Sequence, residues 1–334
     1  MPQSKPTPDH ASSIQTRFRE ATETLAKVRA EISTVIYGQQ EVIDLTLTSL
    51  LAGGHVLLIG VPGLAKTLLV DTMAKVLGLS TGRIQCTPDL MPADVLGSEV
   101  LEEDASGTRS FRFIKGPIFT QFLMADEINR ASPRTQSALL QAMQEQSVTI
   151  SGTHYDLPRP FHVLATQNPI EQEGTYALPE AQLDRFLMQV DVDYPDRDAE
   201  RTMLIATTTN EQRSVRSILK ADQLMDLQTL VRDMPIGETI VDAILNLVRR
   251  GRPGADAPAI VNDYVAWAPG PRAAQALMLG VRAKALLDGR TTPSVDDVAA
   301  LAMPVLKHRM ALNFRARPDG ITLGHVIRDL TEGM

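Results

Sequence analysis

Near the start of the chain, apolar residues recur at three- and four-residue spacing and predict one amphipathic helix. Its apolar face is made of Ile14, Phe18, Ala21, Leu25, Val28 and Ile32. The residues before this helix are polar, and a second helix is expected after residues 37–40. We therefore predict that residues 1–37 form an N-terminal tail and helix in front of a larger domain.

Between residues 38 and 196, short apolar runs alternate with helical stretches. Continuous apolar strands separated by helices are typical of a parallel sheet that is covered on both faces. The five predicted strands cover residues 55–60, 83–86, 121–128, 161–168 and 187–194. This pattern predicts an α/β domain over residues 38–196 with a five-stranded parallel sheet.

Two stretches of this domain have the strand, turn and strand chemistry of inserted hairpins. One lies near residues 98–117, with turn residues at 104–107, and the other lies near residues 147–160. From residue 197 to the end only helical patterns remain, including a helix from Ser294 with Asp297 in its first turn. Residues 197–334 are therefore expected to form an all-α second domain.

Composition narrows the class of protein. The chain has 334 residues, of which 43% are hydrophobic and 22% are charged, and this is enough for two globular domains. A single cysteine, Cys86, excludes an internal disulfide, and the N-terminus has no apolar signal segment, so we expect a cytoplasmic location. Cys86 itself is expected to be a small buried hydrophobic residue. No apolar run approaches the length of a membrane span.

Charge and histidine spacing disfavour two further kinds of site. The net charge is −7, and all of the acidic excess lies before residue 200. Because a sequence-independent nucleic-acid binder needs clustered cations, this distribution disfavours nucleic acid as a partner. The six histidines show no metal-binding spacing, which disfavours zinc.

Candidate chemistry begins after the first strand, where GVPGLAKT, residues 60–67, lies one residue from the phosphate-binding pattern G-x-x-x-x-G-K-[ST]. In such a loop the backbone amides and the helix N-terminus bind phosphate. Gly60 and Gly63 would allow close backbone approach, Lys66 would supply the cation, and Thr67 would bind Mg²⁺. The residues expected around the nucleotide are Gly60, Val61, Pro62, Gly63, Leu64, Ala65, Lys66, Thr67 and Leu68.

Ala65 stands where the general pattern has glycine. A residue that enters a helix can adopt negative φ with little strain, so we expect alanine to be tolerated there. Taken alone, the pattern is equally consistent with an ordinary strand-to-helix turn.

Two carboxylates lie near the end of the predicted strand at 121–128 and favour the nucleotide interpretation. Asp126 would hold Mg²⁺ together with Thr67, and Glu127 would polarise the attacking water. The alternative is a pair of acids that cap the helix beginning near Ser132. That alternative does not explain why both acids follow four apolar residues, where a carboxylate is costly to bury.

A third polar strand end is LATQNP, residues 164–169. Ligands of open parallel sheets bind at the carboxyl ends of the strands, so Asn168 could orient a water between Glu127 and the γ-phosphate. An asparagine that makes a turn before proline is the alternative.

With these segments in place, the chain resembles the MoxR-type AAA+ ATPases from about Gly38 to its C-terminus. The matching segments are GVPGLAKT (60–67), ADEINRASPRTQSALLQAMQE (125–145), LATQNP (164–169) and LPEAQLDRF (178–186). The resemblance implies a P-loop AAA+ core with a C-terminal helical lid, and ATP hydrolysis with ATP and Mg²⁺ as cofactors. Members of this family often carry alanine at the position of Ala65, which implies that nucleotide binding is retained.

The resemblance also implies roles for residues outside the loop. Arg185, in LDRF, matches the arginine that reaches the nucleotide of the next subunit, and its alternative is a surface salt bridge with Asp184 or Glu180. Arg272, in APGPRA, matches the lid arginine that senses the γ-phosphate, although Gly270 replaces the usual serine.

Four further segments have expectations of their own. Tyr37, Gly38 and Gln39 resemble the segment that lies against the adenine, and Arg130 is expected to contact another subunit. Lys115 stands where the family has proline, which leaves the conformation of its loop open. The basic residues 307–309 are expected to form a solvated helix end, with a subunit joint as the alternative.

The resemblance implies a homo-oligomeric ring, most often a hexamer, with a chaperone-like role toward a partner complex. The client is often a protein with a von Willebrand factor A-type domain. Two other classes stay open, namely a nucleic-acid motor and a nucleotide-gated scaffold. The acidic first domain argues against the motor, and Glu127 argues against the scaffold, which needs no general base.

Overall fold

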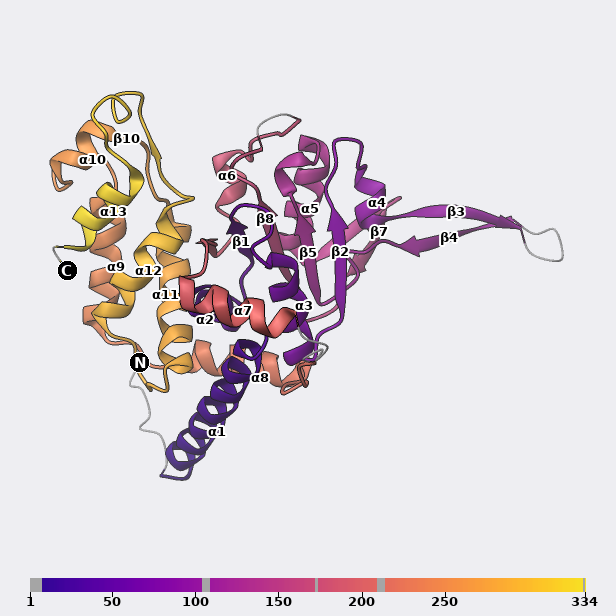
Figure 1. Cartoon of the computed structure of the whole chain (residues 1–334), viewed down its shortest axis with the longest axis horizontal. Helices are drawn as coiled ribbons and strands as arrows, with labels where there is room; N and C mark the ends of the chain where they lie inside the picture. The colour runs from indigo at the N-terminus through magenta and orange to yellow at the C-terminus, as the bar shows by residue number, and fades with distance from the viewer. Residues whose placement is uncertain (1–7, 104–108, 172–173, 209–213, 333) are drawn as a thin grey trace.

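The computed structural model of the chain describes residues 8–103, 109–171, 174–208, 214–332 and 334. Residues 1–7 of the predicted tail and the predicted turn at 104–107 lie outside the described residues. An α/β unit lies beside a C-terminal group of helices, and a long hairpin projects away from both (Figure 1).

The two N-terminal helices form as predicted. Helix α1 spans Pro8–Ser33 and buries Leu25, Val28 and Ile32 against neighbouring helices, and α2 spans Gln40–Leu51. The three- and four-residue spacing of these apolar side chains places them on one face of α1.

The predicted five-stranded parallel sheet is confirmed. Its strands, in spatial order, are β2 (Thr81–Gln85), β5 (Phe122–Asp126), β8 (His162–Gln167), β1 (Val56–Ile59) and β9 (Met188–Asp191). All neighbouring pairs are parallel. Their carboxyl ends therefore meet at one edge of the sheet, which we call the carboxyl edge, and their amino ends meet at the opposite amino edge.

Helices cover both faces of the sheet, which explains why its strands are apolar without alternation. Leu58 belongs to one buried cluster with α1, α2, α3 (Lys66–Val76) and α8 (Ala221–Asp233). The neighbouring Leu57 points to a second cluster with α5 (Pro133–Glu145). Shorter helices are α4 (Pro92–Leu96), η1 (Ile128–Arg130) and α6 (Glu180–Leu183), and α7 spans Arg197–Thr207.

Both predicted hairpins are confirmed. Strands β3 (Gly97–Glu103) and β4 (Arg109–Lys115) pair antiparallel and project from the α/β unit, and β6 (Ser147–Ile150) pairs with β7 (Thr153–Asp156) (Figure 1). Phe113 stacks on Tyr155 with ring centroids 4.4 Å apart, so the two hairpins contact each other. Lys115 continues β4 opposite Gly97, with Nζ 5.2 Å from the Phe119 ring, so it leaves the strand register intact.

The C-terminal region is helical, as expected. Its helices are α9 (Glu238–Arg250), α10 (Ala259–Tyr264), α11 (Pro271–Leu287), α12 (Val295–Leu306) and α13 (Leu323–Thr331). The region also contains a two-stranded antiparallel ladder, β10 (Val265–Trp267) with β11 (Ala311–Leu312), where only helices were expected. Strands of three and two residues are too short to give a periodic signal. No described helix combines the length and the apolar character that crossing a membrane requires.

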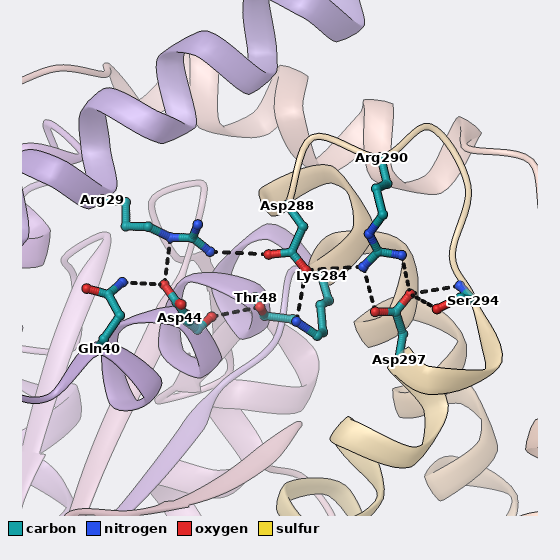
Figure 2. A network of polar contacts seen from close by, with 9 residues as sticks. All are labelled: Arg29, Gln40, Asp44, Thr48, Lys284, Asp288, Arg290, Ser294 and Asp297. Atoms are coloured by element: carbon teal, nitrogen blue, oxygen red, sulfur yellow. Dashed lines mark hydrogen bonds and ion pairs between the residues drawn. The ribbon is translucent and has the colours of Figure 1, made fainter. Parts of the chain in front are cut away.

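A network of charged side chains joins the N-terminal helices to this region (Figure 2). Arg29 of α1 pairs with Asp44 of α2 at 2.7 Å and with Asp288, just after α11, at 3.4 Å. Arg290 then pairs with Asp288 and, through both terminal nitrogens, with Asp297 at 2.7 and 2.6 Å. The predicted cap of α12 by Ser294 and Asp297 is part of this network.

Candidate nucleotide-binding site

The loop after β1 has the close packing that its glycines predict. A side chain at Gly60 would place Cβ 2.5 Å from the carbonyl oxygen of Val192, so only glycine fits there. Gly63 has φ +87°, which L side chains rarely adopt. Lys66 begins α3 and donates from Nζ to the Gly60 carbonyl oxygen at 2.5 Å, which folds the loop back over its own start.

Ala65 precedes α3 with φ 56° and ψ 23°, in the left-handed region. The expectation of a negative φ is wrong. The chain must reverse direction between Gly63 and the first turn of α3, and this reversal falls on Ala65. A left-handed alanine costs about 1 kcal/mol relative to ordinary helical geometry, so backbone strain lies within the loop itself.

The two predicted carboxylates lie at the carboxyl edge. Asp126 ends β5, and Glu127 follows it with φ 54°, a second left-handed residue. Thr166 of the neighbouring β8 donates from Oγ1 to Asp126 at 2.5 Å and accepts from the Glu127 amide at 2.9 Å. One hydroxyl therefore fixes the orientation of both acidic residues, a role that the sequence analysis did not assign.

Strand β2 supplies two more partners that the sequence analysis missed. Arg83 donates to Asp126 at 2.8 Å, and Gln85 donates to Glu127 at 3.0 Å. Both contacts follow from register, because β2 lies beside β5 and pairs Gln85 with Asp126. The sequence contained one signal, a polar and a charged residue at alternate positions of a short strand.

Arg130 contacts acidic residues of its own chain, Glu127 and Glu171, each at 3.3 Å. Its contact with another subunit stays a prediction. Asn168 follows β8, which lies between β1 and β5. Its side-chain oxygen accepts from the Ile170 amide at 3.1 Å, which is the local turn that we gave as the alternative, and its amide faces Glu171 at 3.4 Å.

The segment expected near adenine lies against the loop. Gln39 is buried and donates to the carbonyl oxygen of Leu64 at 3.4 Å. Gly38 has φ +68°, and a Cβ there would lie 2.3 Å from the Cβ of Ala199 at the start of α7. Gly38 and Gln39 thus lie between the loop after β1 and the start of α7. The sequence analysis did not connect α7 with the site.

Burial and charge act in opposite directions on the loop lysine. Burial lowers the pKa of Lys66, while the carboxylates of Asp126 and Glu127 oppose that shift. Cys86 is 2% exposed, as expected, and burial raises the pKa of its thiol to about 12, with the same two carboxylates adding to the effect. The cysteine is therefore a structural thiol next to the site.

The donor set at the carboxyl edge fits a magnesium nucleotide. A hydroxyl on Thr67 and a carboxylate on Asp126 are the hard oxygen ligands that Mg²⁺ takes, usually with phosphate oxygens and water. Lys66 and the glycine backbone suit the phosphates themselves.

The two predicted arginines lie at the amino edge instead. Arg185 precedes β9, and β9 pairs with β1 so that Met188 lies opposite Val56. Arg185 and Arg272 line one cleft together with Gly53. Residues 53 and 60 are seven residues apart, and a strand rises about 3.3 Å per residue, so this cleft lies roughly 20 Å from the phosphate loop of the same chain.

Arg185 makes no salt bridge with Asp184 or Glu180 among the described residues, and its buried Nε has no hydrogen-bond partner there. Asp184 pairs instead with Arg309 at 2.7 Å and with Arg272 at 3.6 Å. The proposed alternative for Arg185 is therefore wrong.

The basic residues 307–309 are not a solvated helix end, and that expectation is wrong. His308 and Arg309 are 3% and 2% exposed. Lys307 pairs with Asp191, and His308 Nε2 contacts the carbonyl oxygen of Phe186 at 3.0 Å. All three residues bind the segment that leads into and forms β9, because α12 ends against that strand.

Comparison with known proteins places this geometry in a family. Residues 55–188 match the ATPase family associated with various cellular activities (AAA), and residues 257–330 match the AAA lid domain. Chaperone MoxR1 of Mycobacterium tuberculosis is 40% identical over 90% of this chain and 78% of that protein. Protein MoxR of Paracoccus denitrificans is 33% identical over 89% of each. The chain belongs to the MoxR family of AAA+ ATPases.

A crystal structure of a candidate ATPase from Cytophaga hutchinsonii has the same fold as this chain. It matches with a TM-score of 0.89 and 36% identity over 97% of this chain and 98% of that one. The MoxR assignment confirms the predicted AAA+ core with a helical lid, and it makes this chain a nucleotide-binding ATPase of a chaperone family. The matched segments leave residues 189–256 uncovered, so the domain boundary at residue 196 stays a prediction.

Proposed function

We propose that this MoxR-type ATPase hydrolyses ATP with Mg²⁺ at the carboxyl edge of its sheet and couples hydrolysis to the remodelling or activation of a partner protein. The observation that carries the proposal is the meeting of the Lys66 loop, the Asp126 and Glu127 pair and Asn168 at the ends of three neighbouring strands. Residues 37–39 and 60–68 would surround the nucleotide.

Each residue has a separate task in this proposal. Lys66 would bind the outer phosphates, while Thr67 and Asp126 would hold Mg²⁺, which when bound neutralises phosphate charge. Glu127 would accept a proton from the attacking water, oriented by its contacts with Gln85 and Arg130. Asn168, at the end of the strand between them, would orient that water.

Arg185 and Arg272 would serve the nucleotide of a neighbouring subunit. They lie at the amino edge, roughly 20 Å from the loop of their own chain, which exceeds the reach of an arginine side chain. An interface that joins the amino edge of one copy to the carboxyl edge of the next is head-to-tail, and such an interface forms a ring when the rotation between copies closes. We propose a homo-oligomeric ring, most simply a hexamer.

The client would be a protein, by analogy with the relative named Chaperone MoxR1. The family resemblance makes a von Willebrand factor A-type domain the first candidate. The two hairpins are coupled through Phe113 and Tyr155 and would face the client or the ring axis. The single cysteine is buried and structural, which suits a reducing cytoplasm.

Two substitutions test the site directly. Lys66→Ala should abolish ATP binding, whereas Lys75→Ala, an exposed lysine of the same helix, should leave it unchanged. Glu127→Gln should bind ATP with wild-type affinity and lose most hydrolysis. Unaltered ATP affinity in Lys66→Ala, measured by calorimetry, would show that the nucleotide binds elsewhere, and wild-type turnover in Glu127→Gln would remove its role as base.

A mixing experiment tests the ring. Arg185→Ala subunits keep a nucleotide site but lack the arginine, and Lys66→Ala subunits have the reverse defect. Mixtures should recover ATPase activity that neither variant has alone. Inactivity at every ratio would show that Arg185 does not act between subunits.

The client can be captured with Glu127→Gln held in its ATP state, because a trapped motor retains its substrate. A purified von Willebrand factor A-type domain protein should be retained by this variant with ATP and released with ADP. ATPase stimulation by DNA that falls steeply with salt would instead favour the nucleic-acid motor.

A further inference from the structure

Arg309 of the lid is hydrogen-bonded to the segment that carries Arg185. Its guanidinium is buried, and all five of its N–H donors are used. Nε donates to the Asp184 carboxylate at 2.7 Å, and the terminal nitrogens donate at 2.6 to 3.2 Å to backbone carbonyl oxygens. Those carbonyl groups belong to Asp184, Phe186, Leu187 and Val305.

These contacts bracket Arg185 in the chain. The carbonyl groups immediately before and after Arg185 both accept from the same nitrogen of Arg309, at 3.2 and 2.6 Å. The backbone of Arg185 therefore cannot rotate independently of the end of α12, to which Arg309 is also bonded through Val305.

Asp184 extends this arrangement to the second arginine. Its Oδ1 is taken by Arg309, and its Oδ2 lies 3.6 Å from Nη1 of Arg272 at the start of α11. Arg272 is half-exposed in the same cleft as Arg185, whose Nε has no partner in the described structure. One partly buried carboxylate thus links the segment that carries Arg185 to Arg272 and Arg309 of the lid.

We propose that Asp184 and Arg309 are positioning residues that hold Arg185 and Arg272 in the geometry needed at the nucleotide of the neighbouring subunit. The proposal rests on the inter-subunit role given to the two arginines above. The lid and the finger segment then form one rigid body, so a movement of the lid in one subunit displaces both arginines at the next nucleotide together.

The planar guanidinium of Arg309 is needed to hold the segment around Arg185. Arginine presents five donors in a fixed plane, whereas lysine presents a compact charge with three donors on a flexible stem. Arg309→Lys keeps the positive charge opposite Asp184 but cannot hold four carbonyl groups at once. A misplacement of about 1 Å at a catalytic group costs on the order of 100-fold in rate, so we expect kcat to fall about 10- to 100-fold.

The first test compares Arg309→Lys with a matched variant of the lid. Arg290 also binds a carboxylate, that of Asp297, through two nitrogens (Figure 2). Among the described residues, the partners of Arg290 are Asp288 and Asp297, and they include neither Arg185 nor Arg272. Arg290→Lys should lower thermal stability and leave kcat unchanged. Arg309→Lys should lower kcat while ATP affinity, measured with ATP and Mg²⁺ by calorimetry, stays at the wild-type value. An equal loss of kcat in both variants would make Arg309 a general stabiliser of the lid and overturn the proposal.

The second test locates the defect by subunit mixing. Lys66→Ala subunits carry intact amino-edge arginines, so they should restore turnover to Arg309→Lys subunits. Arg185→Ala subunits lack the arginine at position 185, so they should not restore turnover to Arg309→Lys subunits. Asp184→Asn, which keeps the side-chain shape, should behave in the same way and serves as the variant of choice if Arg309→Lys does not fold.

A control pair separates this inference from the proposed function. If Arg185→Ala mixed with Lys66→Ala recovers activity while the Asp184 and Arg309 variants are rescued by neither partner or by both, the positioning role is wrong. If the control pair itself stays inactive, the inter-subunit role of Arg185 is wrong, and the positioning role falls with it.

Discussion

Acid should destabilise this protein through two histidines that the fold holds neutral. His55 is buried at the start of β1, where its Nδ1 accepts from the Val163 amide at 3.0 Å. Its Nε2 therefore carries the proton and donates to the carbonyl oxygen of Met143 at 3.1 Å. A second proton on His55 would oppose the Val163 amide, and burial lowers its pKa from 6.5 to about 3, helped by His162.

His162 is constrained in the complementary way. Its Nδ1 faces the carbonyl oxygen of Gly54 at 2.8 Å and must carry the proton, so Nε2 accepts from the Gln228 amide at 3.0 Å. Burial lowers the pKa of His162 to about 4. Both rings are thus neutral for reasons of hydrogen bonding as well as desolvation.

The sign and size of the effect follow from linkage. In the unfolded chain both imidazoles bind protons below their ordinary pKa of 6.5, and in the folded chain they do not. Their contribution is therefore present above pH 6.5 and is lost as the pH falls toward the folded pKa values. At about 1.4 kcal/mol per pH unit, each histidine removes about 2 kcal/mol from the free energy of unfolding by pH 5.

Urea denaturation at pH 7 and pH 5 measures this loss. His162→Asn keeps a donor toward Gly54, and His55→Asn keeps an acceptor toward Val163. Each variant should lose about 2 kcal/mol less than the wild type between the two pH values, because carboxylate contributions are shared and cancel. His325→Asn, at an exposed position, should match the wild type. An undiminished loss in both buried variants would assign the acid sensitivity to other groups and refute the reasoning.

Three further predictions concern the loop, the acid pair and the hairpins. Ala65→Gly should raise the free energy of unfolding, measured by urea denaturation, by up to about 1 kcal/mol because it removes the left-handed alanine. Ala74→Gly inside α3 should lower the free energy of unfolding. A change of the same sign in both variants would contradict the strain at Ala65. Thr166→Val should reduce kcat, because Asp126 and Glu127 lose the hydroxyl that contacts both of them. ATP affinity, measured by calorimetry, should be retained. A loss of ATP affinity without a loss of kcat would contradict this role. A double-mutant cycle of Phe113→Ala and Tyr155→Ala should give a coupling of about 1 kcal/mol in unfolding, and zero coupling would disconnect the hairpins.

The parts of the site that are contiguous in sequence were predictable. Lys66 and Thr67 stand at fixed offsets in a loop of known chemistry, and Asp126 and Glu127 follow an apolar run directly, so local spacing was sufficient. The left-handed conformation of Ala65 was not predictable. The choice between helical and left-handed backbone depends on the direction that the chain takes after Gly63, and the sequence does not give that direction.

The contacts that orient the acid pair depend on strand order. Arg83 and Gln85 reach Asp126 and Glu127 only because β2 lies next to β5, and Thr166 reaches both only because β8 lies on the other side. The sequence predicted five parallel strands but not their order. Since order decides which side chains meet at the carboxyl edge, these partners could not be assigned from spacing.

The misinterpretation of residues 307–309 has a different cause, and the chain did contain a signal against it. A basic triplet is commonly solvated, since buried arginine and lysine are rare unless paired. Here the triplet lies between Leu306 and Met310, both apolar and both buried. A charged run within an apolar stretch either lies at the surface, where the core ends, or is buried in the core with polar partners. The apolar residue that follows favours the second outcome, and the partners that Arg309 finds are the backbone groups around Arg185.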